Sequence, residues 1–346
     1  MLPILPPFGE KTREKERNGW PLERRKQIDL SLVVPCFNEG GNVRRFQEEV
    51  REVFAGSGLT YELVFVDDGS RDDTLAQLRQ LFQEGACPIQ IVRFSRNFGK
   101  EAAMLAGLQA ARGELITLID ADLQQPPATV LDMVRILREE PQYDCVAAYQ
   151  DQRKEGKLQG GLKDTFYRVI NKFSDVEFVA NASDFRTMRR PVAEALVTMG
   201  EYHRFSKGLF SWVGFATKFI PYQVRAREAG ETKWSLPKLF RYAWDGILSF
   251  STAPIKIAIY LGLTFALLAM IYLVVVLVQK LAFSIAVPGY ATIVCLILLL
   301  GGLQLFFLGI LGEYIGRIYI QVKQRPVYLV KEHLTWEASP DQGGTE

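Results

Sequence analysis

The segment LSLVVPCFNE (residues 30–39) joins a continuous apolar run to a polar turn. Near-continuous Val and Leu before that turn are typical of a strand that is covered on both faces of a sheet. Similar runs follow at YELVFV (61–66), IQIVRF (89–94), ELITLI (114–119) and DCVAAY (144–149). Amphipathic stretches separate them, near residues 41–55, 73–84, 100–112 and 128–139. The alternation predicts βαβ units, and therefore an α/β fold with a mostly parallel sheet.

A cluster of polar residues follows each of the first four predicted strands. The clusters are PCFNEGG (35–41), DDGSRDDT (67–74), SRNFGKE (95–101) and DADLQQPP (120–127). Ligands of parallel sheets bind beyond the carboxyl ends of the strands, so we expect these loops to form one site. Each cluster alone has an ordinary alternative: D-x-D arises by chance, and the Asp67 cluster fits a simple turn before a helix cap. Their placement at successive strand ends favours the site.

The residue types in these loops indicate a nucleotide sugar. Carboxylates at alternate positions, Asp120 and Asp122, can hold a hard cation such as Mg²⁺ or Mn²⁺. Such an ion neutralises the charge that grows on a departing nucleoside diphosphate. Asp67 or Asp68 is expected to accept hydrogen bonds from a base or ribose. No G-x-G-x-x-G or G-x-x-x-x-G-K-[ST] is present, which argues against a dinucleotide fold and excludes a P-loop NTPase.

Composition excludes further classes. The chain has 346 residues and a formal net charge of +2, which is too small for a nucleic-acid-binding tail. Its four cysteines lie far apart without C-x-x-C, so neither a zinc ribbon nor a disulfide scaffold is expected. We expect reduced thiols in a domain that faces the cytosol.

Hydrophobicity is concentrated near the C-terminus. No charged residue occurs from Ile257 to Val278 or from Leu281 to Gly312, and Pro288-Gly289 marks a turn between the two stretches. About 20 apolar residues cross a hydrocarbon core of about 30 Å. The pattern predicts two transmembrane helices, about 257–278 and 290–312, rather than the alternative of two buried core helices.

Basic residues predict the orientation of this hairpin. Lys256 precedes it and Arg317, Lys323 and Arg325 follow it, whereas only Lys280 lies in the connecting loop. The positive-inside tendency then places the catalytic domain and both termini in the cytoplasm, in a multi-pass protein of the inner (cytoplasmic) membrane. The first 30 residues mix Lys and Arg with Glu and show no signal peptide.

The polar clusters and the hairpin together resemble the polyprenyl-phosphate glycosyltransferases of glycosyltransferase family 2. The bactoprenol glucosyltransferases are the nearest branch, and the dolichyl-phosphate mannose synthases are more distant. The resemblance covers about residues 29–330. Beyond the first two clusters, the matching segments are FSRNFGKEAAMLAGL (94–108), IDADLQQPP (119–127), SDFRTM (183–188), HRFSKGLFSWVG (203–214), GETKWSLPKLF (230–240), DGILSFSTAP (245–254) and LGEYIGRIYIQVKQRP (311–326).

The resemblance implies a GT-A fold and an inverting transfer from a nucleotide sugar, with UDP-glucose the expected donor, to undecaprenyl phosphate. It implies a metal, Mg²⁺ or Mn²⁺, on Asp120, Asp122 and Gln124. Asp122 and Asp184 are the expected catalytic residues. The expected nucleotide-sugar-binding residues are Pro35, Phe37, Asn38, Glu39, Asp67, Asp68, Gly69, Asn97, Lys100, Asp120 and Ala121.

Three departures from the family pattern stand out. Gln125 occupies a position that is usually acidic, and Ser183 replaces a common Gly before Asp184. Tyr149-Gln150-Asp151 lies where the family is often Arg-rich, which leaves Arg153 and Lys154 as substitutes. The second and third departures bear on which donor sugar the pocket accepts, and they do not change the expected class of reaction.

A lipid phosphate is already anionic near neutral pH, so the reaction needs alignment and charge stabilisation more than a strong base. Asp184 is expected to orient the sugar or the attacking phosphate. Four basic residues between the sheet and the first span are expected to bind the acceptor phosphate, although each could be a solvated surface charge. They are Arg186, Arg204, Lys207 and Lys233.

The expected organisation has five parts: a disordered extension (1–28), the GT-A domain (29–230), interfacial amphipathic helices (231–255), the hairpin (256–316) and a cytoplasmic tail (317–346). Within the third part, residues 236–250 fit a helix lying on the anionic leaflet, with a plain core helix as the alternative. Membrane lipid is thus an expected partner. A second copy of the chain or a flippase is a further candidate partner, and no binding to nucleic acid is expected. Two other functions stay open: a catalytically silent scaffold, and an anchored glycosyltransferase with a non-lipid acceptor.

Overall fold

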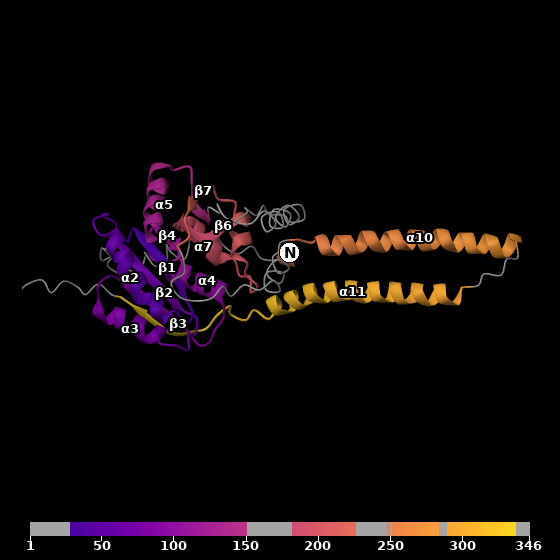
Figure 1. Ribbon diagram of the computed structural model, residues 1–346, viewed down its shortest axis with the longest axis horizontal. Helices are drawn as coiled ribbons and strands as arrows, with labels where there is room; N and C mark the ends of the chain where they lie inside the picture. The colour runs from indigo at the N-terminus through magenta and orange to yellow at the C-terminus, as the bar shows by residue number, and fades with distance from the viewer. Residues whose placement is uncertain (1–27, 151–181, 226–247, 250, 284–288, 337–346) are drawn as a thin grey trace, which may run out of the picture.

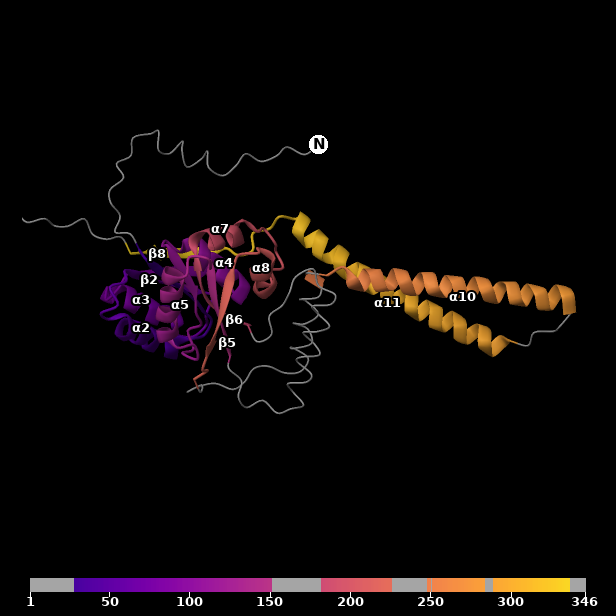
Figure 2. The same cartoon turned by 90° about the horizontal axis from the view of Figure 1, so that it is seen from above.

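The computed structural model describes residues 28–150, 182–225, 248–249, 251–283 and 289–336. An α/β part carries the predicted sheet, and two long helices extend from one end of it (Figure 1; Figure 2). The extension 1–27, the interfacial segment 231–247 and the three basic residues Arg153, Lys154 and Lys233 lie outside the described residues, so the expectations for them stay predictions.

All five predicted strands are present. They are β1 (Leu30–Cys36), β2 (Tyr61–Asp67), β3 (Ile89–Phe94), β4 (Leu115–Leu118) and β5 (Cys145–Gln150). Helices α2 (Gly40–Phe54), α3 (Thr74–Glu84), α4 (Lys100–Ala110) and α5 (Pro127–Glu139) alternate with them. β1 pairs in parallel with β2 and β4, and β2 pairs in parallel with β3, which confirms the α/β fold with a mostly parallel sheet.

Successive residues of β1 face opposite layers of helices, which explains its continuous apolar run. Leu32 and Val34 pack with α2, α3 and α5, whereas Val33 packs with α4 and with α7 (Arg190–Thr198) and α8 (Ser206–Trp212). Gly107 lets α4 lie close to the sheet, because a Cβ there would come within 2.1 Å of Val33 Cγ1. The sheet is therefore the middle layer of three.

Three further strands complete the sheet, in the order β7-β5-β6-β4-β1-β2-β3-β8. β6 (Ala182–Arg189) lies between β4 and β5 and is antiparallel to both, and β7 (Thr217–Tyr222) extends the edge beside β5. The motif SDFRTM covers the middle of β6, but it did not predict a strand, because its alternating polar residues lack the apolar run typical of the other strands.

The segment expected to be a cytoplasmic tail contributes the last strand. β8 (Val330–Thr335) pairs antiparallel with β3 and covers the other edge of the sheet. Tyr328 stacks on Phe94 with ring centroids 4.8 Å apart, and Glu332 forms an ion pair of 2.6 Å with Arg79. Residues 330–335 thus belong to the α/β part, and the tail expected over 317–346 begins inside a helix.

The hairpin consists of α10 (Ala253–Phe283) and α11 (Tyr290–Val322), both longer than the predicted spans. Within them, Ala253–Val276 and Leu299–Val322 are long and apolar enough to cross a membrane, and 0% and 6% of these windows are buried. This exposure argues against the alternative of two core helices, because a core helix is mostly buried. The two helices contact each other; they run alongside in Figure 1 and cross at an angle in Figure 2.

Candidate active site

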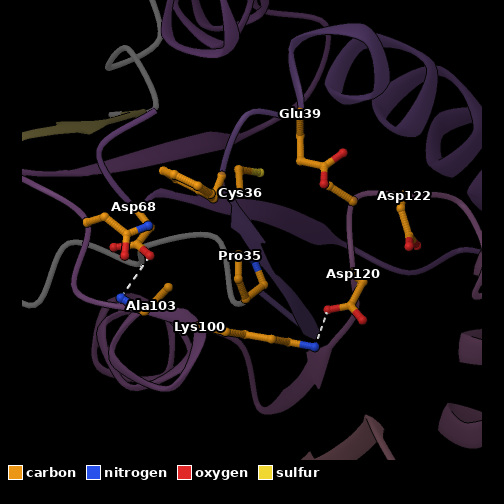
Figure 3. Close-up of a pocket in the computed structure, with 12 residues that line it drawn as sticks. Pro35, Cys36, Glu39, Asp68, Lys100, Ala103, Asp120 and Asp122 are labelled. Atoms are coloured by element: carbon orange, nitrogen blue, oxygen red, sulfur yellow. Dashed lines mark hydrogen bonds and ion pairs between the residues drawn. The ribbon is translucent and has the colours of Figure 1, made fainter. Parts of the chain in front are cut away.

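The loops after β1 to β4 meet at one edge of the sheet, as predicted, and enclose a cavity (Figure 3). The cavity is lined by Pro35, Cys36, Phe37, Glu39, Asp68, Asn97, Gly99, Lys100, Ala103, Asp120, Ala121 and Asp122. Nine of these are predicted site residues, whereas Cys36, Gly99 and Ala103 were not predicted. Cys36 and Ala103 are apolar residues at the end of a strand and inside a helix; both fall within quoted motifs, 35–41 and 94–108, but neither has a side chain that suggested a site.

Hydrogen bonds tie the loop after β1 to the loop after β2. The Asn38 carboxamide oxygen accepts from the Arg71 N–H at 2.9 Å, and the Asn38 N–H donates to the Ser70 hydroxyl at 3.0 Å. Asn38 holds a positive φ of 56°, which Asn tolerates better than most residues. Asn38 and the predicted Gly69 therefore shape the rim and do not line the cavity.

Asp67 and Asp68 have different positions. The Asp68 carboxylate lines the cavity and accepts backbone hydrogen bonds from Phe98 at 2.6 Å and Gly99 at 2.9 Å. Burial raises the pKa of Asp68 in spite of these two bonds. Asp67 is 1% exposed, and its Oδ1 accepts a hydrogen bond from the Ser70 N–H at 3.0 Å. Asp67 therefore stabilises the turn after β2 and does not line the cavity.

Lys100 connects the fourth loop to β6. Its ammonium lies 2.7 Å from Asp120 Oδ1 and 3.3 Å from Asp184 Oδ2. The register explains this contact: β4 ends with Leu118 opposite Arg186, so Asp120 and Asp184 each lie two residues beyond this pair at the same end of the ladder. Although burial alone would lower the pKa of Lys100, the two carboxylates raise it, so the side chain is a cation near neutral pH.

Asp184 is ionised as well. Burial alone would raise the pKa of Asp184, but Lys100, Lys207 and Arg186 hold it below its ordinary value. A carboxylate of this kind accepts hydrogen bonds and does not store a proton. The arrangement suits orientation of a hydroxyl better than general acid chemistry.

The residues expected to hold a metal are partly engaged already. Asp120 Oδ1 is paired with Lys100, and Asp120 Oδ2 accepts the Gln125 amide at 3.0 Å. Gln125 also accepts the Asp120 N–H at 2.9 Å, so the amide at this unusual position fixes Asp120 from two sides. Asp122 lines the cavity, and its Oδ1 accepts the Gln124 N–H at 3.2 Å.

These donors fit a hard divalent cation that keeps several outside ligands. Within the described ranges, no three His, Cys, Asp or Glu side chains gather into a ready-made metal site. Mg²⁺ is commonly held by one or two carboxylates together with substrate phosphates and water. Asp122, with Asp120 and Gln124 beside it, matches that donor set.

The predicted acceptor-binding cations are not equivalent. Arg186 is buried, with its guanidinium carbon 3.4 Å from the centre of the Phe210 ring. Arg204 donates to the carbonyls of Leu196 and Met199 at the end of α7, at 3.0 and 2.6 Å. Lys207 is partly exposed, and its charge lowers the pKa of Asp184. Arg186 and Arg204 thus support the wall of the site, and Lys207 is the better-placed candidate.

Comparison with known proteins gives the family. Residues 31–197 match the family described as Glycosyl transferase family 2, and residues 253–318 match the GtrB C-terminal hairpin. The chain belongs to glycosyltransferase family 2. The first match contains every residue that lines the cavity, together with Asp184, and the second contains most of α10 and α11. The resemblance stated from the sequence motifs is therefore confirmed, and so is the GT-A fold that it implied.

Named relatives match nearly the whole chain. The putative glycosyltransferase CsbB of Bacillus subtilis (strain 168) is 41% identical over 89% of this chain and 92% of its own length. The prophage bactoprenol glucosyl transferase homolog of Escherichia coli (strain K12) is 40% identical over 88% and 99%. The bactoprenol glucosyl transferase of Shigella phage SfII is 38% identical over 88% and 98%. Among solved structures, glucosyl-3-phosphoglycerate synthase from Mycobacterium tuberculosis is 20% identical, with a TM-score of 0.43 over 64% of this chain and 78% of that one.

Proposed function

We propose that this protein transfers one glucosyl unit from UDP-glucose to undecaprenyl phosphate, with inversion, at the cytoplasmic face of the membrane. The observation that carries the proposal is a cavity bordered by Asp120, Asp122 and Lys100 in a domain whose chain continues into two exposed apolar helices. Relatives named bactoprenol glucosyl transferase, 38–40% identical over nearly their whole length, support the choice of sugar and acceptor.

The donor would lie in the cavity. Asp68 and Asn97 line it and would contact the nucleoside, and Phe37, whose side chain is 42% exposed, would stack on the base. Asp122, with Asp120 and Gln124, would hold Mg²⁺ or Mn²⁺, which when bound would neutralise charge on the diphosphate. Lys100 adds a fixed cation on the same side of the cavity.

The acceptor would approach from the side of β6 and α8. A lipid phosphate needs no strong base, so the chain's task is to align it with the anomeric carbon. Ionised Asp184 would accept a hydrogen bond from a sugar hydroxyl, and Lys207 would attract the acceptor phosphate. Inversion follows because the phosphate attacks the face of the sugar opposite to the departing diphosphate.

The apolar hairpin would keep this site within reach of a lipid-borne substrate. α11 contacts the α/β part directly, since Gln321 donates to the Gly200 carbonyl at 2.8 Å. Tethering the domain beside the bilayer raises the effective concentration of an acceptor whose tail is in lipid. Basic residues that flank the hairpin support the cytoplasmic orientation of the domain and of both termini.

The test is incubation of the purified full chain with Mg²⁺, undecaprenyl phosphate and a panel of labelled UDP-sugars. We expect label from UDP-glucose in the lipid fraction, and loss of that label with excess EDTA. Transfer only to a protein or polysaccharide would favour the anchored enzyme with a non-lipid acceptor. No transfer to any acceptor, with nucleotide sugar still bound, would favour the silent scaffold.

A further inference from the structure

Glu101 links two elements that border the site. It lies in the first turn of α4, directly after Lys100, and its carboxylate accepts hydrogen bonds from Ser206 at the start of α8. The Ser206 N–H lies 3.1 Å from both carboxylate oxygens, and the Ser206 hydroxyl donates to Oε2. Glu101 is absent from the described residues that line the cavity. It therefore borders the site without lining the cavity.

Ser206 lies near one end of a segment, residues 199–207, that the membrane hairpin holds at the other end. Gln321 on α11 accepts the Tyr202 N–H at 2.9 Å and donates to the Gly200 carbonyl at 2.8 Å. The segment is thus tied to α11 through Gln321 and to α4 through Glu101. It crosses from the end of the membrane hairpin to the edge of the active site.

The segment carries Lys207, whose charge acts on the site. Lys207 follows Ser206 directly, and it is among the cations that lower the pKa of Asp184. The charged groups that face Glu101 are Asp184 on β6, Arg204 in the segment and Lys207 on α8. Burial raises the pKa of Glu101 to about 7, Asp184 acts in the same direction, and the Ser206 hydrogen bonds and Arg204 oppose it. The Ser206 N–H and hydroxyl both donate to this carboxylate, so hydrogen bonding rather than net charge ties Glu101 to the segment.

We propose that Glu101 is a positioning residue for the acceptor. By holding the Ser206 N–H and hydroxyl, it fixes the end of segment 199–207 so that the Lys207 ammonium stays beside Asp184, where the acceptor phosphate must arrive. This proposal rests on the proposed function. It predicts that loss of Glu101 impairs the use of the lipid phosphate and leaves donor binding intact.

The test compares Glu101→Ala with Glu101→Gln in the full-length protein, with KM measured separately for undecaprenyl phosphate and UDP-glucose. Loosening the segment weakens the contact of Lys207 with the acceptor phosphate, and a hydrogen bond to a charged group contributes about 1.5–3 kcal/mol, so we expect the alanine variant to raise the acceptor KM at least ~10-fold. The donor KM should stay within ~2-fold. The glutamine side chain keeps an oxygen that can accept a hydrogen bond from the Ser206 N–H. In Glu101→Gln the KM for undecaprenyl phosphate should therefore return close to the wild-type value. Glu84→Gln, at an exposed ion pair with Arg44, is the matched control.

Hydrogen exchange supplies a readout that needs no turnover. Exchange in a peptide covering residues 199–212 should accelerate in Glu101→Ala and stay near wild type in Glu101→Gln. An unchanged acceptor KM in the alanine variant, or equal increases in both KM values, would overturn the positioning role. If wild-type protein makes no lipid-linked product, the proposed function fails instead, and unchanged exchange in Glu101→Ala would then reject the structural link by itself.

Discussion

The ammonium of Lys100 lies 3.3 Å from the carboxylate of Asp184, and the same ammonium is 2.7 Å from Asp120. One cation therefore joins the end of a parallel strand, β4, to an antiparallel strand, β6. Without it, the carboxyl groups of Asp120 and Asp184 would lose their shared cationic partner, and like charges that share a site disfavour each other. This contact places Asp184 in the same site as the D-x-D motif.

The first prediction concerns this shared cation. Lys100→Met should raise the pKa of Asp184 and lower kcat at least ~100-fold, the loss typical when one preorganised charge is removed from an active site. Steady-state transfer to undecaprenyl phosphate measures it. Lys218→Met, which removes a lysine on β7 paired with Glu140, is the control and should keep wild-type turnover. Normal kcat in Lys100→Met would show that the bridge is not needed.

The second prediction tests the metal assignment. Asp122→Asn keeps the size of the side chain but removes a charged oxygen ligand, so transfer should be abolished while thermal stability stays within a few degrees of wild type. Asp132→Asn is the matched control, because Asp132 is an exposed carboxylate on α5 paired with Arg135. Isothermal titration with Mn²⁺ and UDP should show weaker binding only in Asp122→Asn. Retained activity in that variant would contradict the assignment.

The third prediction concerns the close approach of two loops at the rim. A Cβ on Gly69 would lie 2.5 Å from the Arg96 carbonyl carbon, and Gly69 has a φ of 68°. Gly56 has a similar φ of 78°, and a Cβ there would have no neighbour within 4 Å. Gly56→Ala therefore measures the cost of the backbone conformation alone, about 1–2 kcal/mol, without any steric clash. Thermal melts should show a clearly larger loss for Gly69→Ala. Equal losses would mean that the loops can separate without cost.

The fourth prediction concerns β8. Ending the chain after Pro326 removes β8 and uncovers β3, and the ring of Phe94 loses its stacking partner Tyr328. An uncovered edge strand promotes association, so this truncation should lower Tm and produce aggregates in size-exclusion chromatography. Ending the chain after Trp336 keeps β8 and should behave as wild type. Monodisperse, stable protein after the first truncation would show that β8 is dispensable.

The fifth prediction uses the titration of Glu101. Its folded pKa of about 7 lies above the ordinary value of 4.5, so the folded state binds more protons than the unfolded state between these values. The stabilisation from this group is fully present below pH 4.5 and is lost as the pH rises through 7. Tm measured from pH 5 to pH 8 should therefore fall less in Glu101→Gln than in wild type. Parallel curves would show that Glu101 does not titrate in this range.

Local sequence determined the first five strands, the four polar loops and the apolar hairpin. Strands such as β1 are buried on both faces and become continuous apolar runs, and parallel order alone brings their carboxyl ends to one edge. The positions of Asp68, Lys100, Asp120 and Asp122 along the chain were therefore enough to predict that they share a site. The family motifs added Asp184, which no strand pattern placed.

The tertiary structure decided how those residues are connected. Pairing between β4 and β6 brought Asp184 and Asp120 within reach of the same lysine, the return of the chain after α11 made β8 an edge strand, and Ser206 met Glu101 across the site. Each of these contacts joins residues that are far apart in sequence. The local sequence around either residue does not indicate which distant residue it will contact. Periodicity reports only whether a side chain is buried, whereas the register between distant strands depends on the packing of the whole sheet.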